Sequence, residues 1–456
     1  AILALGCFWL AGPGRKTCSR QRPEPVWASA MATASRQADV EGYECLGEPP
    51  GTWAGVEERL GFLGGAASLA VSMLGTGIVA SPYCFALCGC LGGPAALLVL
   101  GGLVQLSYAS LIRCTSQLRV PSYGGLIERS EGAHAVPRAW SRYTNVALWL
   151  LLILATTACV LISAHIIRSV ASQALHASSP GLLLSNRGLF ATILIAIYPL
   201  CLATSLHGLS WISTYCSGAI LAVVALITWE AYGISSASPL PASEAVQAGT
   251  TWSSVLLALP IFGCAMFGHM NIAQIYAELR PSVKPHASKV AFIACAFVMV
   301  LYLAVGVVGY MAFGKNTEAD VVSQIAAVRG QSRVVTSIQA LLASFIVLKT
   351  PLIILPLRTL TLAILCLDIN SGDLSAGKNA ALTLALLVCV YCMALALPDL
   401  GKLLELLGAV CVMPLCFVVP ARLSWAVEEP RRTVSCLVMG LAGLLVSALS
   451  LVSMVV

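Results

Sequence analysis

Eleven long apolar runs are the sequence feature that most constrains how this chain can fold. They lie near 62–88, 91–112, 144–168, 188–206, 209–232, 251–275, 289–313, 333–365, 379–397, 401–424 and 433–456. A helix needs roughly 20 mostly apolar residues to cross the hydrocarbon core of a bilayer. Because backbone polar groups find no water there, a run of this length predicts a membrane-spanning helix. The predicted fold class is an all-α integral membrane protein of about eleven transmembrane helices.

The composition favours a membrane domain over a soluble one. Hydrophobic residues make up 58% of the 456 residues, charged residues 10%, and the mean hydropathy is +0.88. A soluble domain carries roughly 25% charged residues, because its surface must stay hydrated. The net charge of +6 is modest and does not indicate a nucleic-acid partner. The partner that this composition predicts is the lipid bilayer.

The chain divides into an N-terminal tail, residues 1–60, and a transmembrane domain, residues 61–456. The segment from Met31 to Glu58 is polar and contains glycine and proline, which predicts a disordered cytosolic tail. The first apolar run, AILALGCFWLAG, is too short to span a bilayer and has no basic residues before it, unlike a signal peptide. Met31 is therefore a candidate for the natural start.

The positions of lysine and arginine predict how the helices are oriented. With the N-terminus inside, nineteen basic residues fall in the tail and the inner loops, and six fall in the outer loops. Cytoplasmic loops carry the excess of basic residues in membrane proteins. This asymmetry predicts a cytosolic N-terminus and places the C-terminus outside or in a lumen. Lys349 is left within a helix.

Two of the runs contain helix-breaking residues. The first holds Gly75-Thr76-Gly77, and the sixth holds Pro260, Gly263 and Gly268. For any single glycine, close packing of neighbouring helices is the simpler explanation. Their positions, five helices apart, match the discontinuous helices of a five-plus-five inverted repeat, which flank a site at the membrane midplane.

Four sequence blocks follow one another along the chain from Leu60 to its end. They are SMLGTGIVASPYCF (72–85), FGHMNIAQIYAEL (267–279) running on to GYMAFG (309–314), TPLIILPLR (350–358) and LLELLGAVCVMPLCFVVP (403–420). In this order and spacing they resemble the amino acid/auxin permease family of the amino acid/polyamine/organocation superfamily. Within that family the chain is most similar to the sodium-coupled neutral amino acid transporters.

The resemblance implies a leucine-transporter-like fold with helices 1 and 6 broken and one extra helix. It also implies secondary active transport of amino acids by alternating access, coupled to a gradient of H⁺ or Na⁺. A zwitterion needs donors for its carboxylate, which a half-helix N-terminus supplies, and acceptors for its ammonium, which unwound carbonyls supply. The substrate-binding residues that we expect are Gly75, Thr76, Gly77, Phe262, Gly263 and Phe267. Phe262 and Phe267 are equally compatible with ordinary packing.

Four residues are candidates for cation coupling or pH sensing: Ser72, His269, Lys349 and Thr350. Sodium-coupled relatives usually carry asparagine at the place of Ser72, and small hydroxyl residues before the proline that follows Thr350. His269 matches a histidine common in the family, and an imidazole titrates near neutral pH. A lysine within a membrane helix costs about 2.5–3.5 kcal/mol on insertion scales, so Lys349 should face a partner or cavity unless it extends to the interface. Its ammonium is a candidate to replace the coupling cation.

The alternatives are an enzyme, a sensor and a transporter of charged amino acids. An enzyme would need paired carboxylates, a nucleophile with its base or metal ligands at membrane depth, and none is evident, so we expect no enzyme, metal or other cofactor. A sensor that binds an amino acid with little flux remains the main alternative. No carboxylate lies near either break in sequence, which favours small neutral substrates. We expect a monomeric transport unit in the plasma membrane or a vacuolar or lysosomal membrane.

Overall fold

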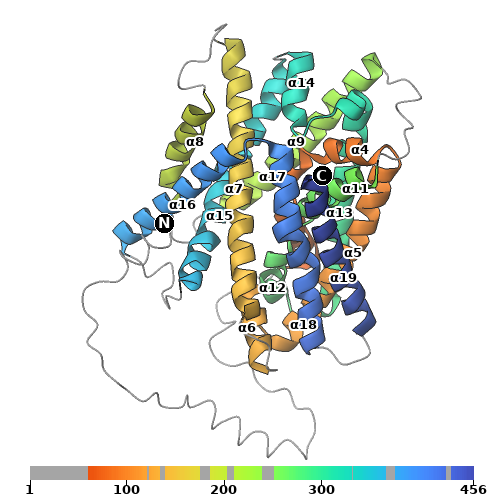
Figure 1. Cartoon of the computed structure of the whole chain (residues 1–456), viewed down its shortest axis with the longest axis vertical. Helices are drawn as coiled ribbons and strands as arrows, with labels where there is room; N and C mark the ends of the chain where they lie inside the picture. The colour runs from red at the N-terminus through yellow and green to blue at the C-terminus, as the bar shows by residue number, and fades with distance from the viewer. Residues whose placement is uncertain are drawn as a thin grey trace, which may run out of the picture. The chain divides into compact units, whose positions relative to one another are not determined.

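The computed structural model describes residues 60–120, 123–133, 139–174, 185–202, 210–238, 251–330, 332–365, 375–427 and 433–455. These residues form helices, and no β-strand is present among them. The predicted all-α fold class is thereby confirmed (Figure 1). The predicted tail, apart from Leu60, and Met31 lie outside the described residues.

The helices follow one another along the described part of the chain in a fixed order. They are α3 (Phe62–Met73), η1 (Thr76–Ile78), α4 (Ser81–Cys88), α5 (Gly92–Leu118), α6 (Tyr123–Ala133), α7 (Ala139–Ala174), α8 (Asn186–Cys201), α9 (Ser210–Ala237), α11 (Trp252–Ala265), α12 (His269–Glu278), η4 (Lys284–His286), α13 (Ala287–Phe313), η5 (Gly314–Asn316), α14 (Val321–Arg329), α15 (Arg333–Ile364), α16 (Ala376–Ala396), α17 (Leu400–Leu407), η7 (Gly408–Val412), η8 (Pro414–Val418), α18 (Val419–Val427) and α19 (Thr433–Val455).

Each predicted apolar run contains helix. Nine described segments are long and apolar enough to cross a membrane by length and composition. The other two runs hold the shorter apolar helices α3 and α8. Helix α3 is shorter than a membrane span because the helix of the first run is interrupted and then continues as α4. In the bundle, α15 packs on α7 and α9, while α13 packs on α3, α4 and α5.

The first and sixth runs are each split into two helices, as predicted. In the first, α3 ends at Met73 and α4 begins at Ser81, with one turn of 3₁₀ helix between them. In the sixth, α11 ends at Ala265 and α12 begins at His269. The two breaks meet inside the bundle, because a Cβ added to Gly77 would lie 3.3 Å from the Cα atom of Ala265. Only a residue without a side chain fits this approach comfortably.

The tenth run departs from regular α-helical geometry. Between α17 and α18 it forms two π-helical segments, η7 and η8. Such segments are often found at functional sites. At the start of η7, Gly408 packs against the backbone of Pro260, and a Cβ on Gly408 would overlap the Pro260 carbonyl. The tenth helix therefore contacts the sixth helix at the proline that precedes its break.

A basic residue counted with the inner loops is fully buried inside the helical bundle instead. Arg358 is on α15 and is 0% exposed. Its guanidinium donates to the side chains of Asn379 and Thr383 on α16, and the Asn379 amide donates to the Leu202 carbonyl at 3.2 Å. A buried guanidinium is tolerated in a membrane protein when it has hydrogen-bond partners of this kind. Arg358 thus joins α15, α16 and the C-terminal end of α8.

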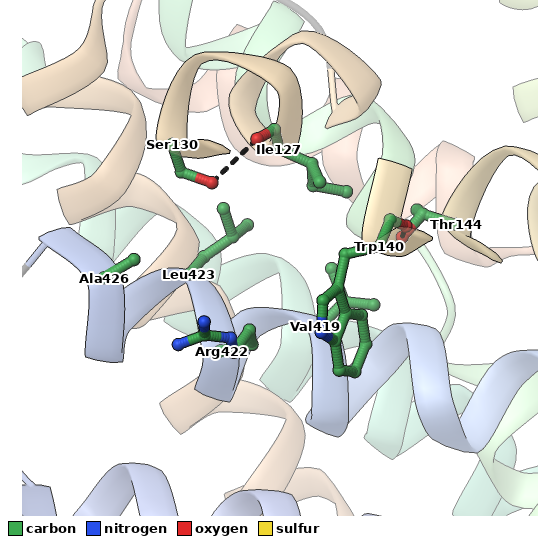
Figure 2. Close-up of a pocket in the computed structure, with 8 residues that line it drawn as sticks. All are labelled: Ile127, Ser130, Trp140, Thr144, Val419, Arg422, Leu423 and Ala426. Carbon is green, nitrogen blue, oxygen red and sulfur yellow. Dashed lines mark hydrogen bonds between the residues drawn. The ribbon is translucent and has the colours of Figure 1, made fainter. Parts of the chain in front are cut away.

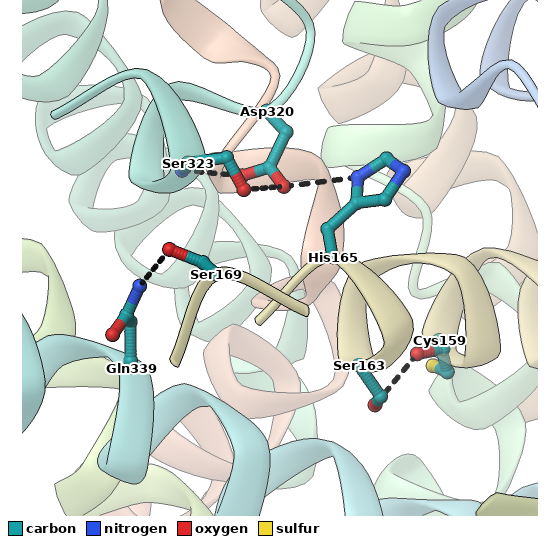
Figure 3. Close-up of polar contacts among 7 residues, drawn as sticks. All are labelled: Cys159, Ser163, His165, Ser169, Asp320, Ser323 and Gln339. Carbon is teal, nitrogen blue, oxygen red and sulfur yellow. Dashed lines mark hydrogen bonds and ion pairs between the residues drawn. The ribbon is translucent and has the colours of Figure 1, made fainter. Parts of the chain in front are cut away.

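A polar contact joins α7 to the start of α14 (Figure 3). The Asp320 carboxylate accepts from the Ser323 backbone N–H at 3.2 Å and from the Ser323 hydroxyl at 2.7 Å. Its Oδ2 atom also lies 3.2 Å from Nδ1 of His165. Asp320 is therefore the N-cap of α14 and at the same time its link to α7.

Replacing Asp320 with alanine should loosen α14. Loss of an N-cap costs about 1 kcal/mol, and loss of the contact with His165 adds to it, so backbone amides of α14 should exchange roughly tenfold faster. Hydrogen exchange followed by mass spectrometry measures this rate for each segment. Asp320→Asn, which still caps a helix, is the control and should exchange much more slowly than Asp320→Ala. Equal exchange in both variants would contradict the capping role.

Candidate functional site

A large cavity connects the broken helices with one end of the bundle. Its volume is about 1000 Å³, within the upper range of small-molecule sites. The lining includes Ser72, Gly75 and Gly77 of the first helix, Cys264, Phe267, Asn271 and Glu278 of the sixth, Leu151 and Cys159 of α7, Lys349 and Pro356 of α15, and Leu404 and Leu407 of α17. It therefore reaches from the breaks toward the end of α12, which lies low in Figure 1.

A second cavity is far too small for an amino acid. It lies between α6, α7 and α18 and has a volume of about 10 Å³ (Figure 2). Such a space holds about one water molecule. Its walls include Trp140, Leu423 and the Arg422 side chain, and the Ser130 hydroxyl beside it donates to the Ile127 carbonyl at 2.8 Å. The larger cavity is therefore the candidate functional site.

Lys349 extends from α15 to the break in the first helix. Its Nζ atom donates to the Leu74 carbonyl at 3.1 Å, and it lies 5.2 Å from the centroid of the Phe345 ring. A Cβ on Gly75 would lie 3.2 Å from the same Nζ atom. The side chain lines the cavity and extends to the break of the first helix. The ammonium is thus hydrogen-bonded to one of the backbone carbonyl oxygens that the break leaves without a helical partner.

The other residues predicted for cation coupling are placed differently. Ser72 lines the cavity, and its hydroxyl donates to the Leu69 carbonyl at 2.7 Å. Thr350 is 2% exposed, is not part of the lining, and donates to the Ile346 carbonyl at 2.8 Å. A threonine that bonds back to the preceding turn in this way has used its only donor. Of these two hydroxyls, only that of Ser72 reaches the cavity.

His269 is packed inside the bundle, away from the cavity. It is 0% exposed and stacks on the Tyr108 ring, with the centroids 4.3 Å apart. Its Nε2 atom lies 3.1 Å from the Ser107 hydroxyl, and its Nδ1 atom lies 3.4 Å from the Cys416 sulfur. Both ring nitrogens therefore have partners, an arrangement typical of a structural histidine.

The residues predicted to bind substrate fall into two groups. Gly75, Gly77 and Phe267 line the cavity. Phe262 does not line it, because its ring packs edge-on against Phe85 with the centroids 6.0 Å apart. Gly263 faces the side chains of Met413 and Val412 in the tenth helix. The backbone of Thr76 belongs to η1, and its side chain lies outside what the structure describes.

Tyr108 is a site residue that the sequence reading missed. Its hydroxyl donates to the Met266 carbonyl at 2.8 Å and accepts from the Gly268 backbone N–H at 2.8 Å. Both backbone groups lie in the break of the sixth helix, where helical partners are absent. One side chain on α5 therefore compensates for the interruption. A tyrosine within a run of small and apolar residues could have been singled out from the sequence, but the sequence does not indicate which groups its hydroxyl contacts.

The comparison with known proteins identifies a family. The sequence profile described as "transmembrane amino acid transporter protein" matches residues 58–454. The chain is 24% identical over 392 residues to "amino acid transporter AVT6E" of Arabidopsis thaliana, covering 82% of this chain and 78% of the relative. It is 24% identical over 169 residues to "sodium-coupled neutral amino acid symporter 2" of Danio rerio, covering 37% of this chain and 33% of that relative.

A solved structure with a similar fold is that of MhsT in complex with L-phenylalanine. The two chains superpose with a TM-score of 0.59 at 12% sequence identity, and the match covers 85% of this chain and 98% of MhsT. At such low identity the similarity concerns the fold alone. It confirms the predicted leucine-transporter-like arrangement, in which the first and sixth helices are broken.

Proposed function

We propose, from the premise that this chain belongs to the transmembrane amino acid transporter family, that it moves small neutral amino acids by secondary active transport. The observation that carries the proposal is the cavity of about 1000 Å³ that reaches the breaks of both helices. Broken helices present backbone groups to a zwitterion at the membrane midplane. Gly75 and Gly77 line the cavity, so the substrate carboxylate can approach their backbone, with the Lys349 ammonium beside Gly75.

The charges around the cavity favour a neutral substrate. Two charged side chains of the described residues line the cavity. Lys349 lies near the breaks, and Glu278, the last residue of α12, lies at the far end of the cavity. An ammonium at the breaks repels a substrate with a cationic side chain. The zwitterion is accommodated because its carboxylate is oriented by the backbone and by this positive charge.

We assign the Lys349 ammonium to the place of a coupling cation. Unwound carbonyls at helix breaks are the groups that coordinate Na⁺ in transporters of this architecture. The contact of 3.1 Å from Nζ to the Leu74 carbonyl uses one of these oxygens. We therefore expect transport that does not need Na⁺ and is driven by a proton gradient, by alternating access of a monomer.

The basic residues of the loops favour a cytosolic N-terminus. We expect the protein in the plasma membrane or in a vacuolar or lysosomal membrane. With that orientation the end of α12 faces the cytosol, because it follows the sixth crossing. The described cavity then opens toward the cytosol, and α4 and α17 lie at the closed, opposite end.

Uptake by purified protein in liposomes tests the proposal. A panel of radiolabelled neutral, acidic and basic amino acids is offered at two pH values, with Na⁺ or with choline. We expect small neutral amino acids to accumulate without Na⁺ and only with an inward proton gradient. Complete loss of accumulation in choline would contradict the role of Lys349. Binding without accumulation under every condition would instead indicate a sensor.

A further inference from the structure

Glu405 is a buried carboxylate that has no role in the function proposed above. It lies on α17, within the tenth apolar run and not in a loop, and it is 6% exposed. The Tyr83 hydroxyl, on α4, lies 3.3 Å from its Oε1 atom. Tyr83 belongs to the half-helix that follows the first break, so this contact joins the first and tenth helices at the end opposite α12 (Figure 1).

Leu404, the residue before Glu405, lines the cavity, whereas Glu405 itself does not. The Cys264 thiol donates to the Leu404 carbonyl at 3.7 Å. Cys264 is the penultimate residue of α11, directly before the break of the sixth helix. Glu405 therefore lies between the elements that flank both breaks. A change of its protonation acts on the helices that must separate when this end opens.

The cation nearest to Glu405 in electrostatic effect is the exposed Lys402, which favours the ionised carboxylate without forming an ion pair with it. Among the described residues, no lysine, arginine or histidine forms an ion pair with it. The titratable groups near it are Tyr83 and Cys84 on α4, Cys264 on α11, and Asp399 and Lys402 at the exposed start of α17. The described parts of α7 and η7, which also pack on α17, add no carboxyl, ammonium or imidazole partner.

An ionised carboxylate at such a place is costly, and a protonated one is not. Burial of a charge within a membrane domain costs several kcal/mol unless it is paired. A protonated carboxyl can accept from Tyr83 and still donate its own proton. A dry environment therefore favours the protonated form, and water that reaches Glu405, either when α4 and α17 separate or from the cavity, favours the ionised form.

We infer that Glu405 binds the coupling proton of the transport cycle, an inference that rests on the proposed function. When the α4–α17 end is open, the carboxylate takes a proton from H₃O⁺ and releases H₂O to that side. The neutral carboxyl allows this end to close around the substrate. Once the cavity is open at the end of α12, water that enters beside Leu404 reaches Glu405, accepts its proton and leaves as H₃O⁺; in the described structure Leu404, but not Glu405, lines the cavity. Lys349 remains a fixed positive charge throughout.

The variant Glu405→Gln separates exchange from coupling. Glutamine has the shape of a protonated glutamate but cannot gain or lose the proton. Purified variants in liposomes are assayed with radiolabelled alanine, or with the panel amino acid that the wild type exchanges fastest. A difference of one pH unit sustains about tenfold accumulation if one proton moves with each substrate. We expect Glu405→Gln to exchange labelled for unlabelled substrate but to lose this tenfold accumulation and the substrate-induced proton flux.

Three further variants make the result specific. Glu318→Gln removes the charge of an exposed carboxylate and should leave coupling intact. His165→Gln removes the partly exposed imidazole beside Asp320, and it should also leave coupling intact. Glu405→Asp retains a carboxyl and should retain proton flux, which a purely structural role of Glu405 does not predict.

The outcomes distinguish this inference from the proposed function. Accumulation by Glu405→Gln equal to that of the wild type would overturn the inference and leave Lys349 as the candidate proton carrier. Equal loss of exchange in Glu405→Gln and Glu405→Asp would also overturn it, because the residue would then be needed for structure alone. Absence of any exchange by the wild type would instead overturn the proposed function.

Discussion

Replacement of Lys349 with methionine should reduce the ratio of maximal uptake rate to KM for amino acid transport by about tenfold to a hundredfold. A hydrogen bond to a charged group contributes about 1.5–3 kcal/mol, and 1.4 kcal/mol corresponds to a factor of ten. Methionine is similar in length and apolar, so it fills the same space beside Phe345. It leaves the Leu74 carbonyl without its donor and removes the positive charge that orients the substrate. Initial uptake rates at several substrate concentrations measure the effect.

Two companion variants show whether the charge at this place is what matters. Lys378→Met removes an exposed lysine at the start of α16, outside the cavity lining, and should leave uptake unchanged. Lys349→Arg retains the positive charge with a larger head group, so its uptake should lie between that of the wild type and that of Lys349→Met. Uptake by Lys349→Met within a factor of two of the wild type, at equal surface expression, would refute the assignment.

The parts of the fold that the sequence predicts well are those set by local composition. The apolar runs identify the helices, because a spanning helix needs an unbroken apolar stretch. Gly75 to Gly77 and the segment that ends at Gly268 mark the breaks, because glycine and proline weaken a helix wherever it lies. Lys349 was identifiable as an exception because a lysine is rare within an apolar run. Each of these signals is contained in one segment of the chain.

The parts that the sequence does not predict depend on how each helix is rotated about its axis. Thr350 is adjacent to Lys349 yet points away from the cavity, since neighbouring residues on a helix lie about 100° apart. Phe262 and Gly263 lie two residues and one residue before Cys264, which lines the cavity, but they face Phe85 and the tenth helix respectively. Sequence blocks place these residues near the break without stating which way they point.

Pairs between distant helices are the second group that could not be predicted. Glu405 and Tyr83 are 322 positions apart, and Tyr108 and Met266 are 158 positions apart. Either residue of such a pair is unremarkable alone, because its role depends on the partner that the fold brings to it. The structure was therefore needed to recognise Tyr108 as a support of the sixth-helix break and Glu405 as a buried carboxylate.

Replacement of Tyr108 with phenylalanine should destabilise the protein by about 2–6 kcal/mol and abolish most uptake. The change removes one oxygen and leaves the ring stacked on His269. It leaves two buried backbone groups, the Met266 carbonyl and the Gly268 N–H, without the bonds that the hydroxyl supplies. Each unsatisfied buried group costs about 1–3 kcal/mol. Because Tyr108 is 0% exposed, water cannot reach these groups without rearrangement of the break.

Tyr302→Phe is the matched control for this prediction. Tyr302 is also 0% exposed, and its hydroxyl lies near the backbone of Gly75 without a hydrogen bond of standard geometry to the described residues, so its removal should change stability by less than about 1 kcal/mol. Denaturant-induced unfolding of both variants in the same detergent measures the difference. If the two variants are equally stable, the Tyr108 hydroxyl does not support the break. A large loss confined to Tyr108→Phe would mean that an interruption needed for substrate binding is held open by one distant side chain.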